Sequence, residues 1–231
     1  MTGQAVGPVG ANIPSFDSIA NYAVNRGGEY EGVRQSLYDF QTYGSAGATS
    51  FTFFQVPQGQ SSKTLDDTNL EVAGSLPAPK HFLVQSIEIL FFPGVNPVTV
   101  ANGTGTDATA SNFTNDAYAI EQAGNLDFFI GSKSYLQEAP IGRFPPKTCL
   151  KTEFASAYQM KQAVAADESS QVNMDYGVFS GRPYFVNPWI LLVPTQNFNV
   201  KLNFNTAVAL PSGQDARIGI VLDGILYRLS Q

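Results

Sequence analysis

Residues 197–205 alternate without a break between large apolar and polar side chains. Phe198, Val200, Leu202 and Phe204 share one side of this run, while asparagines and one lysine occupy the other. A period of two residues is the pattern of a β-strand that buries one of its faces. The chain must therefore contain at least one β-sheet with a core on one side.

The same reasoning predicts strands along most of the chain. In the run 81–92, Leu83, Ile87, Ile89 and Phe91 are expected on one face. Pro188 predicts either an edge strand or a bulge, and the pair Asp223-Gly224 predicts either a hairpin turn or, as the favoured alternative, a bulge that swaps faces. The expected strands are 33–43, 51–56, 81–92, 126–130, 134–138, 184–193, 197–205 and 217–229, with a further candidate at 70–73.

The connections are long. Residues 95–116 are rich in Thr, Asn, Ala and Gly and are expected to form a loop, while the prolines of 139–146 predict an extended segment. One main helix is expected over 150–166, where apolar residues fall near helical spacing. Eight to ten strands with one helix predict an all-β sandwich, most specifically a single jelly roll over residues 29–231, preceded by an N-terminal arm, residues 1–28. A compact double jelly roll is the alternative, which the lack of self-similar halves disfavours.

Charged residues make up 14% of the chain, against about 25% in an ordinary soluble domain. The net charge is −6, which argues against a dedicated, sequence-specific nucleic-acid binder with a basic face. Uncharged polar side chains cost less to desolvate than ions, so such a surface suits packing against neighbouring molecules. The first ten residues have neither a basic nor an apolar region typical of a secretory signal, and no apolar run reaches the length of a membrane span.

Catalytic residues are scarce. His81 is the only histidine and Cys149 the only cysteine, so a nucleophilic triad would have to use one of them. A strand-end or surface imidazole and a small buried thiol are the favoured interpretations, and we expect no enzyme activity, with a catalytic pair of carboxylates as the alternative. No cofactor is expected. The weak candidates for a Ca²⁺ site are the oxygen-bearing residues Asp66, Asp67, Asn69 and Glu71.

A glycine- and proline-punctuated arm, about eight strands with long loops, and strong terminal strands (PWILLVP, NFNVKLNF and ARIGIVLDGILYRL) together resemble the jelly-roll coat proteins of icosahedral viruses. The acidic, histidine-poor composition is similar to coats of tailless bacteriophages. The resemblance implies a structural virion protein, most specifically the major capsid protein, made in the host cytoplasm and located in the virion. It would self-assemble in many copies, as trimers or pentamers, into an icosahedral shell enclosing the genome.

The implied partners are sister copies, other virion proteins and an internal viral membrane. Many small RNA-virus coats carry a basic arm, whereas residues 1–28 contain one Asp and one Arg, so genome neutralisation is expected to come from elsewhere. The expected assembly contacts lie on the arm, the 95–116 loop and the proline-rich segment, with folding back onto the chain's own barrel as the alternative. They are Phe16, Tyr22, Asn112, Phe113, Ile141 and Phe144.

Three competing interpretations remain. The abundance of Tyr and Phe would suit a carbohydrate-binding or adhesin-type sandwich, although the single tryptophan, Trp189, lies in an apolar run and is expected in the core. A hydrolase acting through carboxylates is the second. A minor capsid protein, at a vertex or as decoration, is the third.

Overall fold

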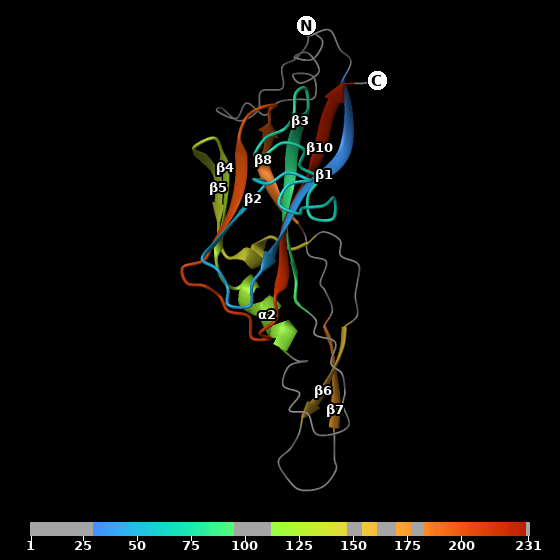
Figure 1. Ribbon diagram of the computed structural model, residues 1–231, viewed down its shortest axis with the longest axis vertical. Helices are drawn as coiled ribbons and strands as arrows, with labels where there is room; N and C mark the ends of the chain where they lie inside the picture. The colour runs from blue at the N-terminus through green and yellow to red at the C-terminus, as the bar shows by residue number, and fades with distance from the viewer. Residues whose placement is uncertain (1–29, 95–111, 147–153, 161–169, 177–182, 230–231) are drawn as a thin grey trace.

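Two antiparallel four-stranded sheets pack face to face in the computed structural model, which describes residues 30–94, 112–146, 154–160, 170–176 and 183–229 (Figure 1). The first sheet has the order β1-β10-β3-β8 and the second β2-β9-β4-β5. The first contains β1 (Tyr30–Tyr43), β10 (Ala216–Leu229), β3 (His81–Phe92) and β8 (Tyr184–Leu192). The second contains β2 (Ser50–Phe53), β9 (Phe198–Asn203), β4 (Asn125–Ile130) and β5 (Lys133–Glu138). The predicted all-β sandwich is confirmed at this level.

The core lies between the sheets. Phe82 and Ile220 from the first sheet and Phe128 and Val200 from the second are fully buried there. In β9 the alternation in the sequence becomes an alternation in burial, with Phe198, Val200 and Leu202 inside. Burying an aliphatic or aromatic side chain contributes about 1.5–3 kcal/mol, so this two-sided core is the main source of stability.

The expected strands are confirmed apart from 70–73, where the chain forms only an isolated bridge, between Val72 and Ser75. β8 is both an edge strand and irregular. Its register shifts between Val84 and Ser86 of β3, so that Gln85 alone lies opposite residues 186–189. Pro188 predicted an edge strand or a bulge, and β8 shows both features.

The register between β10 and β3 shifts at Asp223-Gly224, where a face-swapping bulge was favoured, but the extra residue lies on β3 and not on β10 as predicted. β10 keeps even-numbered residues inward from Ala216 to Leu226, whereas β3 gains the extra residue Gln85. Phe82 and Val84 therefore face the main core before the bulge, and Ile87 and Ile89 face it after the bulge. The prediction that Leu83 shares the face of Ile87 is wrong. Leu83 packs on the opposite face of the sheet with Tyr227.

The predicted main helix, 150–166, is wrong where the structure describes it. Residues Phe154–Met160 form strand β6, which pairs antiparallel with β7 (Ser170–Tyr176) as a separate two-stranded sheet. Phe154 and Tyr158 stand four residues apart, a spacing that fits one face of a strand as well as a helix. The cross-strand partner in β7 decides between the two.

The helix found in the described chain is α2 (Asn112–Glu121), which includes the last residues of the predicted 95–116 loop. Among the α2 residues whose burial the structure describes, Ala117 and Ile120, three residues apart, are the buried apolar side chains, and Asp116 is buried as well. Asp116 accepts a hydrogen bond at 2.9 Å from the backbone N–H of Ser212. The helix thereby covers one end of the sandwich, as Figure 1 shows.

Candidate functional site

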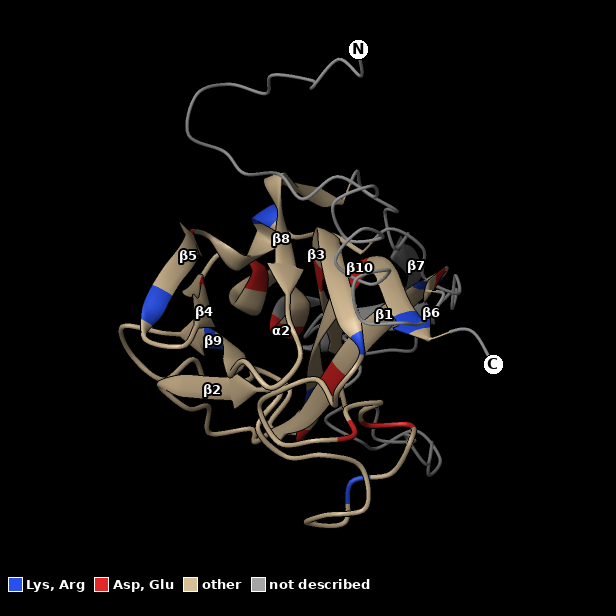
Figure 2. Ribbon diagram, turned by 90° about the horizontal axis from the view of Figure 1, so that it is seen from above, with Lys and Arg blue, Asp and Glu red and all other residues tan. Residues whose placement is uncertain are grey.

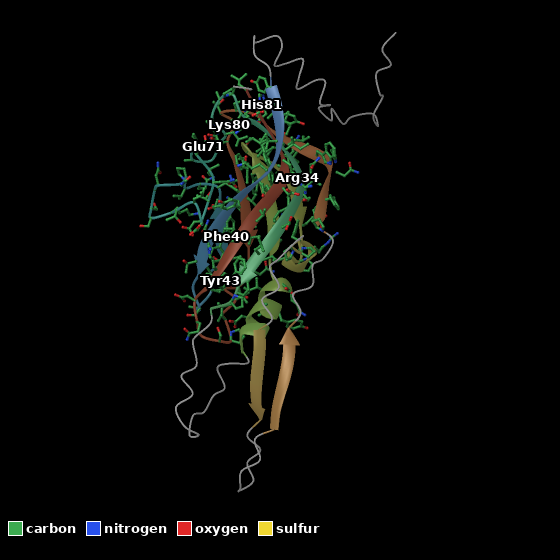
Figure 3. All side chains as sticks on the ribbon, turned by 90° about the vertical axis from the view of Figure 1, so that its right-hand side faces the viewer. Arg34, Phe40, Tyr43, Glu71, Lys80 and His81 are labelled. Carbon is green, nitrogen blue, oxygen red and sulfur yellow. The ribbon has the colours of Figure 1, made fainter. Side chains whose placement is uncertain are left out.

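The edge strands of the two sheets are the natural contact points of a sandwich, because an unpaired edge can add a strand from another chain. The edges are β1 and β8 in the first sheet and β2 and β5 in the second. Residues 57–76, here called the strap, connect β2 to β3 and run along β1 (Figure 3). The two edges of the first sheet, β1 and β8, therefore differ in what lies alongside them.

The strap caps the central part of the β1 edge. The backbone N–H of Phe40 donates to the carbonyl of Asp67 at 2.8 Å. Asn69 bonds β1 twice, with its Oδ1 accepting from the Tyr38 N–H at 3.0 Å and its Nδ2 donating to the Ser36 carbonyl at 2.8 Å. These bonds take up the groups that an incoming strand would need. Strand addition at this part of β1 is blocked.

A buried ion pair fastens the strap to β1. Asp39 is fully buried and pairs with the ammonium group of Lys63 in the strap. The Asp39 carboxylate also accepts a hydrogen bond from the backbone N–H of Phe54 at 2.6 Å. Burial raises the pKa of Asp39, and the bonds from Lys63 and Phe54 oppose that rise. The pair anchors the strap at a cost in desolvation.

The candidate Ca²⁺ residues have other partners. The backbone N–H of Thr64 donates to Asp67 at 3.0 Å and, with Arg217 at 2.9 Å, holds the pKa of Asp67 below its usual value. Glu71 pairs with Lys80 (Figure 3).

Asn69 is turned towards β1, as described above, and Asp66 lies in the turn that follows Thr64. Within the described ranges, no three His, Cys, Asp or Glu residues form a group that could hold a metal ion. All four candidates lie within the strap, where Asn69 bonds β1, Asp67 pairs with Arg217 of β10 and Glu71 pairs with Lys80.

The opposite side of the sandwich carries the β5 and β8 edges. No described strand pairs with the outer edge of either one. Tyr135 on β5 is 50% exposed and Trp189 on β8 is 44% exposed. The expectation that Trp189 lies in the core is wrong, because the irregular stretch of β8 leaves residues 187–189 facing outward. This side, called the open side below, is the candidate interaction surface.

The proline-rich segment seals the core behind this surface. It contains the short 3-10 turn η1 (Ile141–Arg143), and both Ile141 and Phe144 are buried among the chain's own core residues. The Phe144 ring lies 4.6 Å from that of Tyr184 on β8. The expectation that Ile141 and Phe144 contact another subunit is corrected, because both side chains fold back into their own sandwich.

A polar cluster joins β5 to β8 beside this seal. The Tyr184 hydroxyl donates to the Glu138 carboxylate at 3.1 Å, and Arg143 pairs with the same carboxylate. Burial and the neighbouring Glu138 raise the pKa of Tyr184. The cluster fixes the two edges of the open side relative to each other.

The other expected assembly contacts are Phe16, Tyr22, Asn112 and Phe113. Phe16 and Tyr22 lie outside the described residues, as does Cys149. Asn112 and Phe113 begin α2 rather than belonging to a loop.

The strand-end position of His81 is confirmed, whereas a surface position is wrong, since the residue is buried. Its Nδ1 lies 3.0 Å from the carbonyl oxygen of Pro79, and its ring lies edge-on to Tyr30. Both contacts hold the imidazole against residues of its own chain.

Basic side chains are dispersed over the molecule (Figure 2). Of the eight Lys and Arg residues in the described ranges, six form ion pairs with carboxylates. The other two, Lys133 and Lys201, lie over the rings of Tyr135 and Phe129. The described surface therefore has no patch of unpaired basic charge for phosphate groups.

Sequence reasoning missed the strap. One local signal was available, since Thr64 and Asp67 have the spacing at which a hydroxyl residue and an acid cap each other's backbone. Nothing local indicates that this turn lies against β1, because its bonds reach across about thirty residues.

No helix within the described residues is long and apolar enough to cross a membrane. No protein-family model, curated protein or solved structure matches the chain.

Proposed function

We propose that the two sheets form a single jelly roll, the fold obtained when one long antiparallel hairpin wraps around a core. Pairing the eight strands of the large sheets from the chain ends inward gives β1 with β10, β2 with β9, β3 with β8 and β4 with β5. Each of these pairs is an antiparallel ladder. The β10–β3 and β9–β4 contacts join the pairs into two sheets. This order of pairing supports a single roll over a double one.

We further propose that the chain is the coat subunit of an icosahedral virus, assembling in many copies into a shell around the genome. The pairing of the eight strands from the chain ends inward is the observation that carries this proposal. It adds a strand order to the resemblance between this sequence and viral jelly-roll coat proteins. Fold alone does not determine function. The low charge and the open side, with its exposed Tyr135 and Trp189, add a surface suited to contacts between subunits.

The charges bear on which partners such a coat would need. Because the basic side chains of the described surface are paired or lie over rings, this part of the subunit would enclose nucleic acid without neutralising it. Another virion protein, counterions or an internal membrane would then neutralise the genome. This favours a tailless bacteriophage coat over a small RNA-virus coat.

Size-exclusion chromatography with light scattering tests the proposal. The subunit mass is 24.9 kDa, and the proposal expects a species of many subunits that electron microscopy shows as closed particles. A protein that stays monomeric at every concentration and salt condition would contradict it. Copy number per native particle would separate a major coat from a vertex or decoration protein.

A carbohydrate-binding sandwich is the second candidate, favoured by the exposure of Trp189 on the open side. An exposed indole can stack on a sugar ring. Binding on a glycan array that is lost in Trp189→Ala and kept in Tyr135→Ala would favour this function.

A further inference from the structure

One end of the first sheet has an apolar outer face. Leu83 of β3 and Tyr227 of β10 form a second hydrophobic cluster there, separate from the main core between the sheets. Tyr30, Leu191 and Ile225 are partly buried and pack against these two residues. All four strands of the sheet therefore contribute to this group of five residues, called the outer cluster below.

The composition of the outer cluster indicates that a further layer of chain covers it. The second sheet packs on the opposite face of these strands, and the outer face of an antiparallel sheet in water normally carries polar residues. Here Leu83 is 2% exposed and Tyr227 is 3% exposed. The Tyr227 ring lies beside Gly32 of β1, where an added Cβ atom would come within 3.3 Å of it. An apolar group of this kind marks a contact surface.

The outer cluster lies at the end of the sheet where the chain enters it. Tyr30 is the first residue of β1 and pairs with Leu229, the last residue of β10. Tyr227 pairs in turn with His81, the first residue of β3. Figure 1 shows the start of β1 and the end of β10 side by side. The arm, residues 1–28, therefore joins the sheet next to the outer cluster.

The other segments outside the described residues meet the sheet elsewhere. Residues 95–111 follow β3 at its far end. Residues 177–182 precede Tyr184, which pairs with Ile87, four residues along β3 from Leu83. The remaining segments flank β6 of the separate two-stranded sheet or follow β10 by two residues only; they are 147–153, 161–169 and 230–231. The arm is thus the long segment that begins beside the outer cluster.

We propose that the arm folds back over the outer face of the first sheet of its own chain and covers the outer cluster. Gly27 and Gly28 directly precede the start of the sheet, and glycines allow the chain to reverse direction there. The arm contains one Asp and one Arg, so burying it costs little in the desolvation of charge. Its Phe16 and Tyr22 supply large apolar groups for the contact.

The length of the arm is sufficient for this path. Along β1 and β10 the outer cluster extends from the pair of Tyr30 to the pair of Ile225, which is four residues or about 13 Å. Eight residues lead from Tyr22 to Tyr30, and they span up to about 29 Å when extended. Tyr22 can therefore reach every residue of the outer cluster after the chain reverses.

The same connection favours the arm of the same chain over the arm of a second copy. A segment tethered beside its site by a short linker binds at an effective concentration in the millimolar range. The arm would then complete the subunit instead of joining it to a neighbour. Of the two alternatives expected from the sequence, a contact between subunits and folding back onto the chain's own barrel, this proposal selects the second.

Photo-cross-linking in the full-length protein tests the docking. Ile225, in the outer cluster, is replaced by p-benzoylphenylalanine, and the same replacement of Gln137, exposed on β5, is the matched control. Arg26 is the first basic residue of the chain, so trypsin releases most of the arm as the peptide 1–26. The Ile225 variant should form an adduct with this peptide in chains that stay monomer-sized on a denaturing gel, and the control should form none.

Three results would overturn the proposal. Covalent dimers joined through the peptide 1–26 would place the arm of a second copy on the face. An adduct of the Ile225 variant with a different segment, or no adduct, would show that the arm does not cover the outer cluster. Equal adducts in the Ile225 and Gln137 variants would show contact without a defined site.

Urea unfolding of the full-length protein gives the second readout. Phe16→Ser with Tyr22→Ser removes two aromatic rings from the arm, and Asn12→Ser with Asn21→Ser is the matched change of polar residues. The first pair should lower the folding equilibrium constant at least about tenfold, because it removes buried apolar area. The second pair should stay near wild type. Equal effects of the two pairs would contradict the docking.

The result is independent of the proposed coat function. Particles whose subunits lack the adduct would overturn the docking of the arm and leave the coat function standing. Monomers that form the adduct and never assemble would support the docking and contradict the coat function.

Discussion

Replacing Lys63 with methionine should destabilise the sandwich by several kcal/mol at neutral pH. Asp39 is fully buried, and the Lys63 side chain is 14% exposed. Removing one partner of a buried ion pair typically costs about 3–5 kcal/mol, because the other charge stays buried. After the substitution the carboxylate would keep the Phe54 N–H and no cation.

The cost should depend on pH. The pKa of Asp39 is already raised by burial, so the stability this carboxyl contributes is present at low pH and declines as the pH rises through its folded-state pKa. Without Lys63 that pKa should rise further. The destabilisation by Lys63→Met should therefore be largest at about pH 7 and should shrink towards about 1 kcal/mol near pH 4.

Urea unfolding of dilute, unassembled protein at both pH values measures this difference. Asp39→Asn and the Asp39→Asn/Lys63→Met double variant complete a cycle in which the double variant should lose less than Lys63→Met alone. Arg228→Met is the matched control, since its pair with Glu31 is exposed and worth less than about 1 kcal/mol. A cost for Lys63→Met below about 1 kcal/mol at neutral pH, or one independent of pH, would refute the reasoning.

Gly219→Val should destabilise the sandwich by about 1–3 kcal/mol in thermal unfolding, because a Cβ atom there would lie 2.1 Å from the Phe40 ring. Gly44→Ala is the control: its Cβ atom would meet nothing within 4 Å, so its stability should be near that of wild type. Burial raises the pKa of Tyr43 to about 12, so wild type should lose stability as the pH rises from 10 towards 12, and Tyr43→Phe should lose less over that range; equal losses would contradict this. Phe144→Ala should cost about 3–5 kcal/mol by calorimetry, and a cost near zero would show that the residue does not close the core.

The strands that the sequence predicts best are those with one buried face. In β9, burial follows the alternation of the sequence residue by residue. β3 was located correctly, but its faces were not, because the bulge at Gln85 depends on how β10 lies against it. A local pattern cannot contain that pairing.

The helix predicted over 150–166 failed for a related reason. Phe154 and Tyr158 satisfy the spacing of a helix and of a strand, and the partner strand that decides between them lies beyond Met160 in the sequence. Trp189 was placed in the core because its neighbours are apolar, yet the irregular register of β8 turns it outward.

The candidate site was the least predictable part. The expected contacts Ile141 and Phe144 are core residues of their own chain, whereas the strap and the open side are defined by pairings between distant segments. Which edge of a sheet is covered depends on tertiary structure, so only the complete set of pairings reveals it.

We propose that this chain is a rolled-hairpin sandwich that assembles with copies of itself. Electron cryomicroscopy of the purified full-length protein tests it most directly. We expect closed particles whose density shows eight-stranded subunits in the pairing order described, with β1 capped by the strap and contacts between copies away from that edge. Isolated monomers, or particles whose subunits join by strand addition at the centre of β1, would contradict it.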